Sequence, residues 1–264
     1  MAYIIAICNE KGGVAKTTTT YSLGAALADD GKHVLLVDLD PQGNLSLANG
    51  IDINNQEIIQ NSSSEILLDG LHLKNTIRPS NTPNMDIISS SPRMAEAEQF
   101  LPVRDDYASI LKDAFQQKIG NYDFILMDCP PSMGTINTNA LTAADLLIIP
   151  TQAEYFSAYA LRDMMIFIRR IRKENNPSLA YRILITLLDE RNRTHRTIRE
   201  QLQQTFGNGL FQTVIEVDTR LRESPIIGLP ITQYRPNSRG AQQYRVLAQE
   251  LIDYVEKQKN SQPD

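Results

Sequence analysis

Cysteine is scarce in this 264-residue chain, and neither Cys8 nor Cys129 belongs to a C-x-x-C pair. Both lie beside apolar runs, so we expect them to pack as small buried side chains without a disulfide or metal role. No apolar run approaches the roughly 20 residues needed to cross a bilayer. No signal-peptide pattern precedes Tyr3. We therefore expect a cytoplasmic protein that has no membrane partner.

Histidine and aromatic residues are also few. His33, His72 and His195 show no ligand spacing, and Tyr and Phe are too scattered to indicate stacking on nucleic acid bases. Positive charge is in the minority, with a net charge of −5. Residues 155–245 nevertheless hold fifteen Lys or Arg and eight Asp or Glu, a local charge of +7 that leaves −12 elsewhere. A basic face on an acidic protein is therefore compatible with this sequence.

Apolar strands alternate with helical segments along the chain, which predicts an α/β fold with a doubly wound, mainly parallel sheet and helices on both faces. We expect one domain over residues 1–258 and a short polar tail over 259–264, with a turn-rich connection over 41–83. The strands are predicted at 3–8, 33–38, 85–89, 124–128, 146–150, 182–188 and 211–215. The helices are predicted at 21–28, 65–68, 105–118, 135–144, 156–173, 194–206 and 241–257.

Residues 9–20, N-E-K-G-G-V-A-K-T-T-T-T, lie between the first strand and the first helix, where a phosphate-binding loop is expected. Its glycines let backbone N–H groups turn inward, Lys16 supplies positive charge, and Thr17 offers a hydroxyl to magnesium. The helix that follows adds the positive end of its dipole. This pattern predicts a site for a nucleoside triphosphate with Mg²⁺. The predicted contacts come from Lys11, Gly12, Gly13, Val14, Ala15, Lys16, Thr17 and Thr18.

Three aspartates follow two further strands. Asp38 and Asp40 lie at the carboxyl end of the second strand, the edge at which ligands bind in open α/β sheets. Ile125-Leu126-Met127-Asp128 has the apolar-then-acidic form of a Walker B segment. We predict that Asp40 orients or deprotonates the attacking water and that Asp128 holds the metal, through water. Asp38 is predicted to support either the magnesium shell or the loop.

The phosphate loop departs from the ordinary pattern G-x-x-x-x-G-K-[ST], because Glu10 and Ala15 stand where its two glycines belong. Lys11, five residues before Lys16, makes the loop resemble the deviant Walker A motif of the ParA/MinD ATPases. The resemblance to the ParA/Soj branch extends over nearly the whole chain. It is carried by V-D-L-D-P-Q-G-N (37–44), S-S-E-I-L-L-D-G (63–70), D-C-P-P-S (128–132), I-P-T-Q-A-E (149–154), R-L-R-E-S-P-I-I-G-L-P-I (220–231) and R-P-N-S-R-G-A-Q-Q-Y (235–244).

This resemblance implies a P-loop NTPase fold and an ATP-dependent sandwich homodimer, with catalytic roles for Lys11, Lys16 and Asp40. The signature lysine, Lys11, would reach the phosphates of the partner subunit. The family binds DNA non-specifically and hydrolyses ATP weakly until a ParB-like or McdB-like adaptor stimulates it. Its cargo is a plasmid, a chromosome or a protein organelle such as a carboxysome. The protein would be cytoplasmic and associated with the nucleoid when ATP is bound.

The same resemblance suggests further contacts. Pro230 is predicted to border the adenine, and Gln152 and Glu154 lie in a run that the family places near the nucleotide and the dimer interface. Arg220, Arg222 and Arg239 are the predicted DNA contacts. The alternative is that the arginines of this region are solvated or paired with nearby acids. The acids available are Asp189, Glu190, Glu200 and Glu223.

Two other functions stay open. A membrane-associated positioning ATPase of the MinD type shares the nucleotide machinery, but residues 257–264 are too polar for the expected amphipathic anchor. The second function is a nucleotide-switched binding module with negligible hydrolysis. The presence of Asp40, the predicted water-orienting residue, argues against it.

Overall fold

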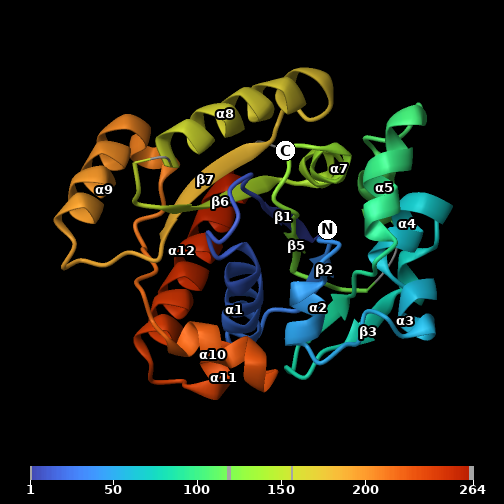
Figure 1. Ribbon diagram of the computed structural model, residues 1–264, viewed down its shortest axis with the longest axis horizontal. Coiled ribbons are helices and arrows are strands. Elements are labelled where there is room, and N and C mark those ends of the chain that lie inside the picture. The colour runs from blue at the N-terminus through green and yellow to red at the C-terminus, as the bar shows by residue number, and fades with distance from the viewer. Residues whose placement is uncertain (1, 118–119, 156, 262–264) are drawn as a thin grey trace.

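The computed structural model describes residues 2–117, 120–155 and 157–261. A single seven-stranded sheet in the order β3-β4-β2-β5-β1-β6-β7 forms its centre (Figure 1). Within the described chain, β3 pairs antiparallel with β4 and the remaining strand pairs are parallel. The strands are β1 (Tyr3–Ile7), β2 (Val34–Asp38), β3 (Ile77–Pro79), β4 (Met85–Ile88), β5 (Phe124–Asp128), β6 (Leu146–Gln152) and β7 (Ala180–Thr186).

Two helices that are distant in sequence pack together on one face of the sheet. α1 (Lys16–Asp29) lies against α12 (Arg239–Ser261), as Figure 1 shows. Leu27 of α1 and Leu251 of α12 are fully buried in the apolar core that joins these helices to the sheet. Three short helices extend this layer: α2 (Asn44–Ala48), α10 (Arg220–Ile227) and α11 (Ile231–Tyr234).

A second apolar core fills the opposite face. α7 (Thr135–Ala143) is buried along its whole length there, which leaves no solvent-facing side on this helix. It packs against α5 (Met94–Phe100), α6 (Ile110–Phe115) and α8 (Ser157–Glu174). α4 (Ser63–Asp69) and α9 (Arg193–Phe206) also contribute side chains to this core. With helices on both faces of a mainly parallel sheet, the predicted doubly wound α/β fold is confirmed.

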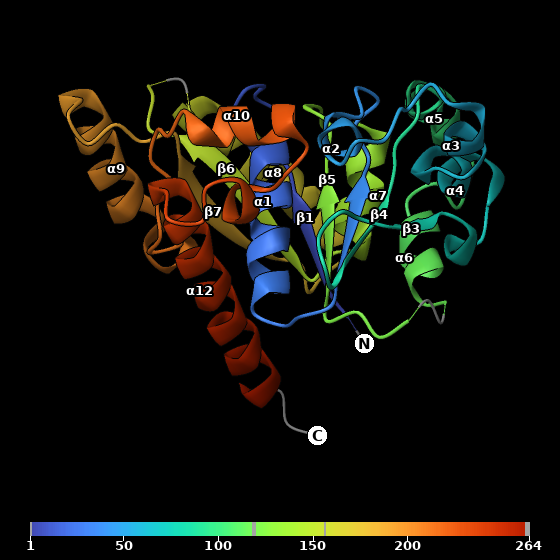
Figure 2. The same cartoon turned by 90° about the horizontal axis from the view of Figure 1, so that it is seen from below.

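The strand register brings the predicted motifs to one edge. Asp128 of β5 pairs with Ile7 of β1 on one side and with Asp38 of β2 on the other. The loops that leave these three strands therefore emerge side by side, along the upper edge in Figure 2. The fold thus places the phosphate loop and both acidic segments next to one another at the same edge of the sheet.

Several predicted elements differ from the observed ones. The strand expected over 211–215 is wrong, since the region forms isolated bridges from Leu210 to Ile183 and from Glu216 to Leu188. The backbone N of Phe211 and that of Ile215 donate to the carbonyls of Ile183 and Ile185 in β7, each at 2.9 Å. Between them, the Glu250 carboxylate of α12 accepts the N–H groups of residues 212 and 213, at 2.6 and 2.9 Å, so a helix side chain interrupts the strand pairing.

The helix expected over 105–118 is shorter than predicted, because the regular part is α6, and Lys118 lies outside the described residues. The helix expected over 156–173 is α8, and Phe156 lies outside the described residues. α12 continues to Ser261, so the predicted tail is helical over 259–261, and residues 262–264 are not described. The remaining helices and turns that the sequence did not predict are α2, α3 (Gln56–Gln60), α5, α10, α11, η1 (Leu73–Asn75), η2 (Leu101–Val103) and η3 (Gly207–Gly209).

Both cysteines are buried, as expected, and both are free thiols. Across the described chain, no helix combines the length and the apolar character of a membrane span.

Candidate nucleotide site

The loop between β1 and α1 ends in left-handed backbone. Gly13 has φ +73°, and Ala15, directly before the first helical residue, has φ +67°. This conformation is uncommon for a residue with a side chain. Among the described residues, no side chain caps α1, and its first turn holds no acidic residue. The N–H groups of this first turn are therefore available to an anion.

Lys16 is buried, with 8% of the residue exposed. Its Nζ donates a hydrogen bond to the carbonyl of Lys11 at 3.2 Å, and it forms no ion pair with any described carboxylate. A buried ammonium group with one neutral partner is costly to desolvate. Phosphate oxygens bound beside the loop would supply the missing negative charge.

Thr17 and Asp128 are already in contact. The Thr17 hydroxyl donates to Asp128 Oδ2 at 2.7 Å, and the Thr20 hydroxyl lies 3.3 Å from Oδ1. Burial, reinforced by the neighbouring charge of Asp38, raises the pKa of Asp128 well above its ordinary value. A divalent cation placed here would stabilise the ionised carboxylate. A hydroxyl and a carboxylate together suit Mg²⁺, which binds few protein ligands and keeps several waters.

Asp38 uses both carboxylate oxygens within its own loop. Oδ2 accepts from the backbone N and the hydroxyl of Ser46, at 2.8 and 2.7 Å, and Oδ1 accepts from the backbone N of Asp40 at 3.1 Å. Burial raises the pKa of Asp38 to about 6, although the bonds from Ser46 oppose this shift. Of its two predicted roles, this geometry favours support of the loop over support of the magnesium shell.

Asp40 lies on the loop beyond β2 and lines the cavity next to the phosphate loop. Its Oδ1 accepts from the backbone N of Gln42 at 2.9 Å, and within the described residues Oδ2 has no hydrogen-bond partner. One oxygen therefore fixes the side chain, and the other is free to accept a hydrogen bond from a water.

Lys11 is held away from this cavity. Its Nζ lies 2.6 Å from Glu154 Oε2 and 3.1 Å from Gln152 Oε1, both from the segment at the end of β6. The side chain is 30% exposed, in contrast with Lys16. Gln152 also donates from Nε2 to the carbonyl of Gly13 at 3.3 Å. The two lysines of the loop therefore have different environments, one inside the cavity and one at the surface.

The cavity measures about 630 Å³, a size suited to a small ligand. The wall opposite the phosphate loop is largely apolar. It is built from Leu187, Ile215, Asp218, Leu221, Arg222, Pro225, Ile226 and Tyr244. The sequence patterns missed this wall, because its members come from four places: the residue after β7, the segment before α10, α10 itself and α12.

Pro230 is not part of this wall. It is buried at the start of α11, where its carbonyl accepts from the backbone N of Gln233 and Tyr234 at 3.0 and 2.9 Å. Pro225, within α10, lines the cavity. The predicted contact of Pro230 with the base stays a prediction.

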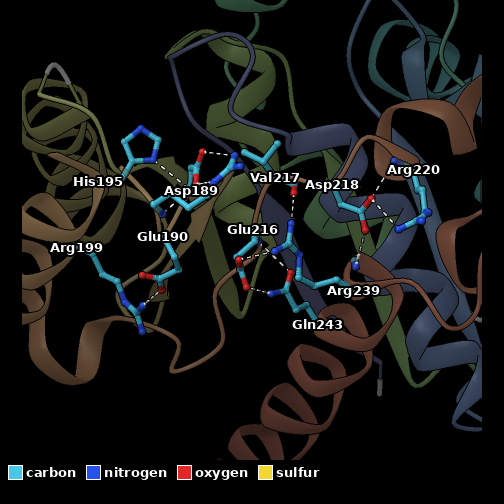
Figure 3. Close-up of polar contacts among 12 residues, drawn as sticks. Asp189, Glu190, His195, Arg199, Glu216, Val217, Asp218, Arg220, Arg239 and Gln243 are labelled. Carbon is cyan, nitrogen blue, oxygen red and sulfur yellow. Dashed lines mark hydrogen bonds and ion pairs between the residues drawn. The ribbon is translucent and has the colours of Figure 1, made fainter. Parts of the chain in front are cut away.

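The three arginines predicted to contact DNA have different surroundings. Arg222 lines the nucleotide cavity. Arg239 Nη1 lies 2.7 Å from Glu216 Oε2, and Arg220 Nη1 lies 3.9 Å from Asp218 Oδ1 (Figure 3). Arg220 and Arg239 are therefore paired with acids, which was the alternative to contact with DNA. The acids are Asp218 and Glu216, not those that the sequence suggested.

Fold and site together define a P-loop nucleoside triphosphate-binding protein. Comparison with known families agrees, since a model described as an AAA domain matches residues 2–181. The sporulation initiation inhibitor protein Soj of Bacillus subtilis is 40% identical over 252 residues, which cover 95% of this chain and 98% of Soj. The chain belongs to the ParA/Soj family of P-loop ATPases.

Two solved structures are similar over almost their whole length. Cobyrinic acid a,c-diamide synthase from Mycobacterium smegmatis, with bound ATP analogue and magnesium, is 30% identical with a TM-score of 0.85, covering 97% of this chain and 96% of that one. A plasmid partition protein from Borrelia burgdorferi bound to AMPPNP is 25% identical with a TM-score of 0.84, covering 96% and 100%.

Proposed function

We propose that this protein is an ATPase that dimerises when it binds ATP, binds DNA without sequence preference and positions or segregates a cargo. A ParB-like or McdB-like partner would stimulate its hydrolysis. The observation that carries the proposal is the contrast between Lys16, buried in the cavity, and Lys11, held outside it by Glu154. A lysine that does not serve its own cavity is available to a second subunit.

The nucleotide would bind with its phosphates on the loop and on the first turn of α1. Lys16 would neutralise phosphate charge, and the base would occupy the apolar wall around Leu221 and Pro225. Thr17 and Asp128 would hold Mg²⁺, which neutralises charge on the phosphates. The relatives whose structures contain ATP analogues or magnesium support this assignment.

Asp40 would orient the attacking water through its free oxygen, while Gln42 fixes the other. Phosphoryl transfer depends mainly on positioning and charge. A second lysine contributed by the partner subunit would complete that charge, so catalysis would require dimerisation. In each subunit, Lys11 would first leave its contacts with Glu154 and Gln152.

Binding of DNA would place phosphates against arginines near α10 and the start of α12. Since the proposed contacts are electrostatic and independent of sequence, affinity should fall steeply with salt. The names of the relatives support a role in partition, because one of them is a plasmid partition protein. We place the protein in the cytoplasm, associated with the nucleoid in its ATP-bound state.

We predict that the protein with ATP and Mg²⁺ binds duplex DNA of unrelated sequences with similar affinity. The affinity should fall by roughly 10³-fold or more between low and physiological salt, as expected for several phosphate contacts. Fluorescence anisotropy with two unrelated labelled duplexes measures this. Absent binding, or binding that does not change with salt, would refute the DNA part of the proposal.

The two other functions have weaker support. A MinD-type membrane ATPase would share the nucleotide machinery and would bind a lipid surface in its ATP-bound state. A module that binds nucleotide without hydrolysing it would have no need of a carboxylate with a free oxygen facing the cavity. Co-sedimentation with liposomes and a phosphate-release assay would test these alternatives separately.

A further inference from the structure

One short segment belongs both to the nucleotide cavity and to the arginine surface. Ile215 and Asp218 line the cavity and are 1% and 8% exposed. Glu216 and Val217, between them, contact the start of α12, as Figure 3 shows. Any movement of residues 215–218 in response to a nucleotide would therefore change their contacts with α12.

Glu216 is the centre of the contact with α12. Its Oε2 accepts from Arg239 Nη1 at 2.7 Å, and its Oε1 accepts from Gln243 Nε2 at 2.9 Å. Its backbone N donates to Gln243 Oε1 at 3.0 Å, and Arg239 Nη2 donates to the carbonyl of Val217. Both terminal guanidinium nitrogens of Arg239, Nη1 and Nη2, are thus engaged within the protein and would have to be released to contact a phosphate.

Asp218 makes a second contact of the same kind. Its Oδ2 accepts from the backbone N of Gly240 at 3.0 Å, and its Oδ1 accepts from the backbone N of Arg220 at 3.0 Å. The Arg220 side chain lies 3.9 Å from the same oxygen. Two acids separated by one residue therefore hold two of the predicted DNA-binding arginines.

Two neighbouring arginines are also paired with acidic side chains, but these pairs do not line the cavity. Arg191 pairs with Asp189 at 2.9 Å, and Arg199 pairs with Glu190 at 2.5 Å. The backbone N of Val217 donates to the carbonyl of Leu188 at 3.0 Å, which joins the two loops. Arg191, Arg199, Arg220 and Arg239 thus each pair with a carboxylate, and the charges of these eight side chains balance.

We propose that Glu216 is the residue that makes DNA binding depend on nucleotide. Glu216 neutralises Arg239 and holds it, together with the start of α12, against residues 215–218, and a nucleotide in contact with Ile215 and Asp218 loosens this hold. The inference rests on the proposed function, because it assigns a regulator to the DNA-binding surface. The cavity and the start of α12 are also linked directly. Tyr244, one turn beyond Gly240 in α12, lines the cavity, and its hydroxyl lies 3.1 Å from the hydroxyl of Thr19 in α1.

The test is Glu216→Gln, which keeps the size of the side chain and removes its charge. Anisotropy with a short labelled duplex at low salt, without nucleotide and with a non-hydrolysable ATP analogue and Mg²⁺, gives two affinities. We expect nucleotide-free affinity to rise roughly three- to fivefold, the range of a partly exposed ion pair, while the ATP-state affinity changes by less than about twofold. The ratio of the ATP-state affinity to the nucleotide-free affinity should therefore fall.

Glu190→Gln is the matched control, since it removes the same charge and frees Arg199 without touching the cavity wall. It should raise both affinities by a similar factor and leave their ratio unchanged. Glu216→Gln combined with Arg239→Gln should lose the gain in nucleotide-free affinity. Equal effects of Glu216→Gln in both states, or a ratio like that of the control, would overturn the inference. If the unchanged protein fails to bind DNA even with nucleotide, it is the proposed function that fails.

Discussion

The Lys11→Ala protein is expected to bind ATP and to remain monomeric. Its hydrolysis should fall by roughly 10³-fold or more, because a single cation at the transferring phosphate contributes about that much to the rate. Lys16 remains in the cavity of this variant, so nucleotide binding should survive. Phosphate release measured over a range of protein concentrations checks the prediction. The rate per subunit should rise with concentration for the unchanged protein and stay flat for the variant.

Glu154→Gln is the control for this experiment, because it removes the ion pair that holds Lys11 and keeps Lys11 itself. We expect this protein to hydrolyse ATP at least as fast as the unchanged one, since its lysine leaves the surface more easily. Near-normal hydrolysis by Lys11→Ala would refute the role of this lysine in a second subunit.

Asp40→Ala should favour the dimer, whereas Lys11→Ala should remain monomeric. Loss of the group that orients water should slow hydrolysis by roughly 10²- to 10⁴-fold, while nucleotide binding and dimerisation persist. An ATP-bound dimer should therefore accumulate. Single-turnover phosphate release, together with analytical ultracentrifugation in the presence of ATP, measures both effects.

Asp40→Asn separates chemistry from loop structure. Asparagine can still accept the hydrogen bond from the backbone N of Gln42, so the loop should keep its shape, but its amide is a poor base. We expect it to hydrolyse as slowly as Asp40→Ala. Turnover at the normal rate in either variant would remove Asp40 from catalysis.

The core of the site was predictable because its signals are local. Residues 3–20 encode a strand, a glycine turn and a helix start in sequence order, and the acids of β2 and β5 each end an apolar run. Parallel strand pairing then places Asp38 directly beside Asp128. Short-range sequence pattern and the geometry of a parallel sheet were sufficient here.

The opposite wall of the cavity could not be predicted in this way. Tyr244 reaches the site because α12 packs on α1, a contact between residues more than two hundred positions apart. Arg222 and Pro225 lie on a helix that contains a proline and has no clear apolar periodicity, so α10 gave no helical signal. The side chain of Glu250 replaces a strand partner over residues 212–213, which tertiary structure alone reveals.

Static light scattering of the unchanged protein tests the central claim most directly. With saturating ATP and Mg²⁺, and with Asp40→Ala as the slowly hydrolysing reference, the mass should double from monomer to dimer and return to monomer with ADP. A mass that stays monomeric under saturating ATP and Mg²⁺ would contradict a site completed by Lys11 from a second subunit.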